Sequence, residues 1–299
     1  MEITLNRESK ERRIGILFIR LFIPLLLLFT VLSVGLWKYS YIFGRSNETE
    51  KDVPVLKVGE RNETSLLKPL PIPQPSIKKI VVPVAPKSAG TSTAGWWKYP
   101  NVIKETTRSG DDLLVLVNKE YRLPSTYVPA GLVYANTSGI RVTTKASYML
   151  RSIVIEDLRE LNNDAKKAGL NLSVISGYRS YAAQSGTYNY WVNYNGGNYD
   201  VVDQISARPG HSQHQLGTAM DFSSSEIGDR LGSEFTDTKA GKWLAANAWK
   251  YGFVISYPKG WEAVTGYTYE SWHYRYIGRE NAKEMVESGI ILEDYLKNK

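Results

Sequence analysis

Two short segments, SQHQLGTAMD (Ser212–Asp221) and ESWH (Glu270–His273), carry the residues that decide how this 299-residue chain must fold. The chain has three histidines, and all of them lie in or directly beside these segments. His214 and Asp221 from the first segment and His273 from the second offer two imidazoles and one carboxylate. This set suits a catalytic zinc ion that keeps one coordination position open. The fold must therefore bring together two segments that are far apart in the sequence.

The spacing of seven residues between His214 and Asp221 requires a bend in the backbone. On an uninterrupted strand the two side chains would point to opposite faces. Gly217 can provide the bend, because glycine adopts backbone conformations that other residues avoid. Glu270 precedes the strand that carries His273, so its carboxylate can lean over the metal. We therefore expect Glu270 to take the proton from zinc-bound water and later to deliver it to the leaving amine.

Arg179 is the best candidate for choosing the substrate. It follows an apolar run at residues 172–176 that predicts a strand, so it is expected at a strand end. A guanidinium group can hold a carboxylate with two parallel hydrogen bonds. A cation that holds the terminal carboxylate of a peptide would make a zinc peptidase a carboxypeptidase.

Composition narrows the possible chemistry and partners. The chain has no cysteine, which excludes disulfides and thiolate metal sites. Its net charge of +7 is unevenly distributed, because residues 1–95 carry 14 Lys and Arg against 8 Asp and Glu, whereas residues 96–299 carry 23 against 22. The part that is expected to fold is therefore nearly neutral. We expect no nucleic-acid partner, and the basic N-terminal part suits an anionic membrane surface or cell wall.

The first third of the chain predicts a membrane anchor and a stalk. Residues 14–37 are apolar apart from Arg20 and long enough to cross a bilayer, and no signal-peptidase site follows them. The bias of basic residues predicts that residues 1–13 form a cytoplasmic tail. Residues 38–95 are rich in proline, serine, threonine and lysine, which favours an extended extracytoplasmic stalk. We therefore expect a single-pass protein of the cell membrane, with residues 96–299 folded outside.

The domain of residues 96–299 mixes helix and strand patterns. Apolar residues at three-residue and four-residue steps predict helices, and short apolar or alternating runs predict strands. The predicted helices cover residues 145–169, 181–195 and 239–251, and the predicted strands cover residues 113–117, 172–176, 253–255 and 272–277. This order predicts an α+β fold, with a small antiparallel sheet flanked by helices and the zinc site on the sheet. The tryptophans at 243, 249 and 272 are interpreted as core residues rather than as a platform for sugars.

Four blocks of sequence, in this order and spacing, resemble the VanY-type D-alanyl-D-alanine carboxypeptidases. They are Asn118-Lys119 with Leu123-Pro124, Tyr127 and Pro129; Ser176–Ser180 with Gln184; Arg208–Asp221; and Glu270–Gly278. The resemblance covers roughly residues 113–290. It implies a LAS-type fold and a zinc peptidase that removes the C-terminal D-alanine from peptidoglycan stem peptides.

The resemblance also implies a role for each matching residue. His214, Asp221 and His273 would be the zinc ligands, and Glu270 would be the catalytic base. Arg179 and Gln184 would bind substrate, and Ser212 stands where the serine of the family assists. His211 is expected to be a bystander near the pocket, and Ser271 stands where many relatives have proline.

Two other functions stay open at this point. A related zinc endopeptidase could cut within the stem peptide or its crossbridge with the same metal site and no carboxylate clamp. A non-catalytic wall-binding module could use the metal for structure alone, although Glu270 argues against it. The sequence leaves open whether the penultimate residue of the substrate is D- or L-configured, which metal is native, and the oligomeric state.

Overall fold

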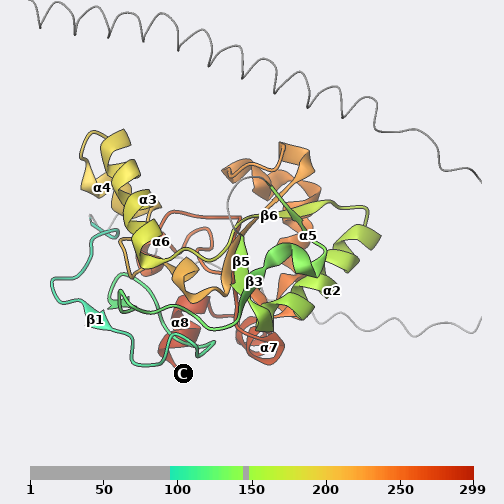
Figure 1. Cartoon of the computed structure of the whole chain (residues 1–299), viewed down its shortest axis with the longest axis horizontal. Helices are drawn as coiled ribbons and strands as arrows, with labels where there is room; N and C mark the ends of the chain where they lie inside the picture. The colour runs from blue at the N-terminus through green and yellow to red at the C-terminus, as the bar shows by residue number, and fades with distance from the viewer. Residues whose placement is uncertain (1–94, 144–147) are drawn as a thin grey trace, which may run out of the picture. The chain divides into compact units, whose positions relative to one another are not determined.

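The computed structural model describes residues 95–143 and 148–299, which form a mixed α+β fold (Figure 1). Its centre is a five-stranded sheet with the strand order β4-β6-β7-β9-β8. The strands are β4 (Arg141–Val142), β6 (Leu172–Ser176), β7 (Ala219–Ser224), β9 (His273–Tyr276) and β8 (Phe253–Ile255). The β6, β7, β9 and β8 strands pair antiparallel, as predicted, but β4 pairs parallel to β6. The chain between β4 and β6 makes a crossover through α2, which is the connection that parallel neighbours need.

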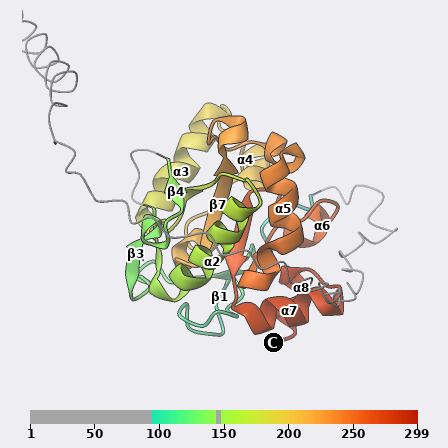
Figure 2. The same ribbon diagram turned by 90° about the vertical axis from the view of Figure 1, so that its right-hand side faces the viewer.

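The sheet divides the domain into an apolar side and a polar side. Helices α2 (Ile155–Lys167) and α5 (Lys239–Asn247) lie over one face, where Phe222, Phe253 and Tyr274 of the strands complete the main core (Figure 2). Successive side chains of a strand point to opposite faces. Asp221 and His273, one residue away from Phe222 and Tyr274, are therefore directed to the other face, which holds the candidate site.

The predicted helix at residues 145–169 begins later than expected. Met149–Arg151 forms strand β5, which pairs antiparallel with β3 (Leu132–Tyr134), and a 3-10 turn follows at Ser152–Val154. Leu150 and Val154 are buried, as the helical spacing requires, but they reach the core from a strand and a turn. A pattern of buried residues therefore does not distinguish strand β5 and this 3-10 turn from the first turns of a helix.

Within its observed bounds, α2 follows from its sequence. Leu158, Leu161 and Ala165 are fully buried, acidic residues occupy the first turn, and lysines occupy the last turn, where each charge suits the helix dipole. Gly169 follows the end of the helix with a left-handed backbone (φ of 76°), and its N–H donates to the Lys166 carbonyl. Gly169 therefore forms the C-terminal cap of α2.

The predicted strand at residues 113–117 is wrong. Val115 and Val117 are buried as expected, but the segment forms turns and irregular backbone. The carbonyls of Leu113 and Val115 accept hydrogen bonds from Nη2 of the buried Arg275, at 2.9 and 2.7 Å. In a sheet, these carbonyls would accept hydrogen bonds from the backbone N–H groups of a neighbouring strand; here the guanidinium of Arg275 is the donor. Nothing in the local pattern of residues 113–117 reveals this partner.

Two helices form a pair beside the sheet. The α3 helix (Tyr181–Tyr194) starts where the Ser180 hydroxyl accepts a hydrogen bond from the N–H of Ala183, and α4 (Tyr199–Ile205) follows after a short turn (Figure 1). Tyr188 and Val192 of α3 pack with Val202 of α4 in a small cluster of their own. The helix predicted at residues 181–195 is confirmed.

The predicted helix at residues 239–251 consists of α5 and a 3-10 turn, Ala248–Tyr251. The remaining elements are short: β1 (Lys104–Glu105), β2 (Tyr121–Arg122), α6 (Glu262–Thr265), α7 (Arg279–Ser288), α8 (Leu292–Lys297) and 3-10 turns at Ala135–Ser138, Gln213–Leu216, Ser225–Ile227 and Ser233–Asp237. The predicted tail, membrane anchor and nearly all of the stalk, at residues 1–94, lie outside the described residues. Of the helices in residues 95–143 and 148–299, none is long and apolar enough for a membrane span.

Candidate metal centre and active site

The backbone around Gly217 brings the two halves of the predicted metal site together. His214 lies in the 3-10 turn Gln213–Leu216, which Gly217 ends with a left-handed backbone (φ of 68°). The β7 strand then begins, and Asp221 stands directly opposite His273 of β9 in the antiparallel register. The predicted bend at Gly217 is confirmed. It lies between the 3-10 turn that contains His214 and strand β7, which contains Asp221.

The three predicted ligands lie at distances that fit a zinc ion. His214 Nε2 is 3.3 Å from Asp221 Oδ2, and His273 Nδ1 is 2.9 Å from Asp221 Oδ1. All three side chains are buried, and their ligand atoms lie within 4.8 Å of one another. Two atoms that both bind a tetrahedral zinc at about 2.0–2.1 Å are about 3.3–3.4 Å apart. The donor set therefore needs only small adjustments to hold the ion.

The hydrogen bonds of the two imidazoles orient them for metal binding. His214 Nδ1 lies 2.7 Å from the carbonyl oxygen of Gly177, and His273 Nε2 lies 3.3 Å from Oε1 of Gln213. Ser256 Oγ donates to the same Gln213 oxygen at 2.7 Å. Because a carbonyl oxygen only accepts, the facing ring nitrogens would carry the protons when a metal ion is bound. His214 Nε2 and His273 Nδ1 are then left to present lone pairs beside Asp221.

The charges of this centre also suit a divalent cation. Burial lowers the pKa of His214, so its imidazole is neutral near pH 7. For Asp221, burial alone would raise the pKa, but the neighbouring His214 and His273 hold it below its ordinary value. Together the two imidazoles and one carboxylate would leave a bound zinc with a net charge of about +1.

Glu270 lies against this cluster with 14% of its side chain exposed. Its Oε2 is 3.8 Å from His273 Nδ1. Burial raises the pKa of Glu270 well above its ordinary value, the charge of Asp221 raises it further, and Arg179 acts in the opposite direction. A carboxyl group whose pKa is moved toward neutrality can both accept and return a proton. This is the property that the predicted base requires.

Arg179 lies at the same centre, in a fixed position. Its backbone N–H donates to the His214 carbonyl at 3.1 Å, and its guanidinium donates to Gln184 Oε1 and to Ser176 Oγ, both at 2.9 Å. Gln184 in turn donates to the Ala207 carbonyl at 2.6 Å. The positive charge of Arg179 is close enough to influence the pKa of Glu270 and of His214. The fold therefore brings together the predicted clamp and the predicted base.

Ser212 and His211 have local roles. The Ser212 hydroxyl accepts a hydrogen bond from the backbone N–H of His214 at 3.3 Å, which starts the 3-10 turn that carries this ligand. His211 lies apart from the cluster, with Nδ1 2.7 Å from the Asn118 carbonyl and its ring edge-on to Tyr99. Burial lowers the pKa of His211 to about 4. Its expected role as a bystander is consistent with this position.

Two residues at the centre were not predicted from the sequence. Gln213 supports His273 through its side-chain oxygen, and the ring of Tyr257 stacks on the His273 imidazole with centroids 5.0 Å apart. Gln213 stands between Ser212 and the ligand His214, so its place in the motif offered a signal. Tyr257 offered none, because its contact with His273 depends on how the segment after β8 folds back.

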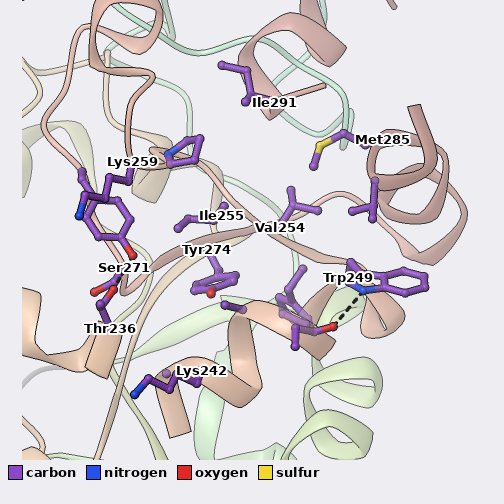
Figure 3. A pocket seen from close by; sticks show the side chains of 18 of the residues that line it. Thr236, Lys242, Trp249, Val254, Ile255, Lys259, Ser271, Tyr274, Met285 and Ile291 are labelled. Carbon is purple, nitrogen blue, oxygen red and sulfur yellow. Dashed lines mark hydrogen bonds between the residues drawn. The ribbon is translucent and has the colours of Figure 1, made fainter. Parts of the chain in front are cut away.

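A separate apolar hollow of about 530 Å³ lies beside β8, between α5 and α7 (Figure 3). Val254 and Ile255 of β8, Trp249 and Met285 are among the residues around it. It contains no predicted site residue. Ser271, the neighbour of Glu270, does line it, and the Ser271 hydroxyl is buried without a hydrogen-bond partner in the described part of the chain. The candidate metal-binding residues, Glu270 and Arg179 are therefore not among the residues that line this hollow.

Comparisons with known proteins agree with this geometry. Residues 147–279 match the VanY family, described as D-alanyl-D-alanine carboxypeptidase. YodJ of Bacillus subtilis (strain 168), which carries the name of a carboxypeptidase, is 38% identical over 205 residues, which are 67% of this chain and 74% of YodJ. The structure of the LdcB LD-carboxypeptidase is 36% identical, with a TM-score of 0.60 over 67% of this chain and 92% of LdcB.

A zinc complex of the vancomycin resistance D,D-pentapeptidase VanY is 29% identical, with a TM-score of 0.51 over 61% of this chain and 98% of VanY. Both structures therefore share the arrangement of the described domain. Zinc is the cofactor that this likeness and the His214, Asp221 and His273 cluster support together. The chain belongs to the VanY family of D-alanyl-D-alanine carboxypeptidases and is a zinc carboxypeptidase.

Proposed function

We propose that this enzyme removes the C-terminal D-alanine from peptidoglycan stem peptides. The observation that carries the proposal is the position of Arg179, whose guanidinium is fixed by Gln184 and Ser176 beside Glu270 and the three metal-binding side chains. A fixed guanidinium can hold the terminal carboxylate of a peptide in two hydrogen bonds. The peptide bond next to that carboxylate would then lie at the metal centre, which favours an exopeptidase over an endopeptidase.

The side chains of the site have distinct roles in this proposal. His214, Asp221 and His273 would hold the zinc ion, which when bound supplies a Lewis acid for the scissile carbonyl and for water. Glu270 takes a proton from the attacking water and delivers it to the nitrogen of the leaving D-alanine. Arg179 holds the carboxylate, Gln184 orients Arg179, and Ser212 assists at the start of the 3-10 turn.

The place of action follows from the N-terminal sequence. Residues 14–37 would anchor the chain in the cell membrane, residues 38–95 would form the stalk, and residues 96–299 would act outside the cytoplasm on the wall. Peptidoglycan lies on that side of the membrane. The anchor would therefore hold the enzyme beside its polymeric substrate.

A second candidate differs only in the residue before the scissile bond. The likeness to the LdcB LD-carboxypeptidase, at 36% identity, is greater than the likeness to the D,D-pentapeptidase VanY, at 29%. This favours action on tetrapeptides, in which an L-configured centre precedes the terminal D-alanine. The same carboxylate clamp and the same base would serve both substrates.

Mass spectrometry after incubation with purified stem peptides tests the proposal. We expect the loss of one alanine from a pentapeptide, a tetrapeptide or both, and no cleavage of peptides whose C-terminus is amidated. Arg179→Ala should lower kcat/KM by about 10- to 100-fold, because a charge-assisted hydrogen-bond pair to the substrate is lost. Arg179→Lys, which keeps one positive charge, should retain an intermediate activity. Unchanged cleavage by Arg179→Ala, or equal cleavage of amidated peptides, would support the endopeptidase alternative instead.

A further inference from the structure

The α3 helix exposes a cluster of aromatic side chains, Tyr190, Trp191 and Tyr194, which we name the α3 aromatic surface. Tyr190 is 59% exposed and Tyr194 is 71% exposed. Their rings stack with centroids 6.1 Å apart and an angle of 23° between the planes. Trp191 meets both rings edge-on, at 5.3 and 5.7 Å. The two tyrosine rings are thus held in a defined arrangement while more than half of the surface of each residue stays exposed to solvent.

Folding does not account for this surface. The buried residues of α3 are Gln184, Tyr188 and Val192, and the last two make the contact with α4. Trp191 is half-buried against the same cluster, whereas the two exposed tyrosines are not part of it. Exposed aromatic groups that gather in one place on a soluble domain are typical of binding surfaces.

The sequence segment that carries the α3 aromatic surface is polar but uncharged. Residues 181–198 contain no Asp, Glu, Lys or Arg, and they include four asparagines, Asn189, Asn193, Asn195 and Asn198. Nucleic acids and anionic membranes are bound mainly through lysine and arginine, which this surface lacks. Open aromatic rings beside amide side chains suit a neutral ligand with an apolar face and many hydroxyl or amide groups. The rings of a glycan have this chemistry.

The α3 aromatic surface and the proposed substrate site lie toward opposite ends of the same helix. The α3 helix begins next to Arg179, and Tyr190 and Tyr194 lie ten and fourteen residues after Ser180, or about 15 and 21 Å along the helix axis. An extended peptide of four or five residues spans about 13–18 Å. A stem peptide that binds Arg179 with its carboxylate and runs along α3 would therefore bring its other end to the tyrosines. That end is joined to the glycan strand.

We propose that the α3 aromatic surface binds the pyranose rings of the amino-sugar glycan strand that carries the stem peptide. This inference rests on the proposed function, because it takes the substrate to be a stem peptide of peptidoglycan. The enzyme then holds its polymeric substrate at two points, the sugar and the terminal carboxylate. The second contact raises the effective concentration of the peptide at the metal centre.

The test compares two forms of the same substrate with the zinc-loaded full chain. We would measure kcat/KM on free stem peptides and on identical peptides attached to glycan strands, for Tyr190→Ser, Tyr194→Ser and the double variant. The double variant should lose about tenfold on the glycan-linked substrate and stay within about twofold of the unchanged enzyme on free peptides. Tyr134→Ser is the matched control, since Tyr134 is also 59% exposed but belongs to β3. It should change neither value.

A second measurement separates this proposal from the proposed function. Sedimentation with glycan strands stripped of their peptides reports sugar binding whether or not any peptide is cleaved, and the double variant should lose it. A chain that cleaves no stem peptide but binds stripped strands through the two tyrosines would refute the proposed function alone. Equal losses on free and glycan-linked peptides, no loss on either, or loss of binding to phosphatidylglycerol vesicles with unchanged binding to stripped strands would each overturn the α3 proposal.

Discussion

The side-chain oxygen of Gln213 lies 3.3 Å from Nε2 of His273, although the two residues are 60 positions apart in the sequence. Ser256 donates to the same oxygen, so Gln213 is held in this orientation from a third segment. The contact fixes which ring nitrogen of His273 faces the metal site. Gln213 is therefore a positioning residue for His273, the proposed zinc ligand in β9.

Replacing Gln213 should lower the affinity of the enzyme for zinc. Gln213→Leu removes the acceptor for His273 and is expected to lower zinc affinity by about 10- to 100-fold, as is usual for partners of metal-bound histidines. Gln213→Glu keeps an acceptor oxygen and should retain most of the affinity. Titration against a competing chelator measures both values. Zinc affinity in Gln213→Leu equal to that of the unchanged enzyme would contradict the assigned role.

Variants of Glu270 and Asp221 should differ in their effects, because Glu270 is the proposed base and Asp221 is a proposed zinc ligand. Glu270→Gln keeps the size of the side chain but cannot accept a proton, so turnover should fall by about 10²- to 10⁴-fold while zinc content stays at one ion per chain. Asp221→Asn removes a charged ligand and should lower the zinc content itself. Metal analysis alongside stem-peptide assays gives both results. A Glu270→Gln enzyme that is fully active would rule out the proposed mechanism.

Gly217→Ala should damage both stability and the metal site. The new Cβ would take a left-handed φ of 68° and would meet Arg151 and Leu132 at 3.1 Å and Pro129 at 3.2 Å. We expect a loss of about 1–3 kcal/mol in the free energy of unfolding, measured with urea. Gly228→Ala is the matched control, because its φ is 67° but nothing lies within 4 Å of the added carbon. An equal loss in both variants would mean that backbone strain alone, without crowding, explains the effect.

His211 should make the stability of the domain depend on pH. Burial lowers its pKa from 6.5 to about 4 in the folded state, so the unfolded chain binds more protons between these values. The stabilising contribution is complete above pH 6.5 and is lost as the pH falls through 4, and it amounts to up to about 3 kcal/mol. His211→Asn retains a donor for the Asn118 carbonyl and does not titrate there.

Urea unfolding of both metal-free proteins between pH 4 and 7 measures this dependence. The free energy of unfolding of the unchanged chain should fall more steeply toward pH 4 than that of His211→Asn. Parallel pH profiles for the two proteins would show that His211 titrates normally in the folded state.

The sequence predicted the α+β class, the positions of α3, β6 and β8, and the residues that form the metal cluster. These predictions depend on local spacing, on residue chemistry and on motifs whose order is specific. The strand predicted at residues 113–117 and the early start of α2 failed for one reason. Val115, Val117, Leu150 and Val154 are buried, as their patterns indicate, but burial does not specify the hydrogen-bonding partners of the backbone.

The sequence by itself thus supplied two imidazoles and a carboxylate that can bind zinc, a second carboxylate that can act as a base, and an arginine that can hold a substrate carboxylate. Tertiary structure alone decided that Gln213 supports His273 and that the guanidinium of Arg275 donates to the Leu113 carbonyl. It also decided that Tyr190 and Tyr194 of α3 remain exposed. Residue type fixes what a side chain can do chemically. Which partner it meets depends on segments that are brought together only when the sheet and its helices pack.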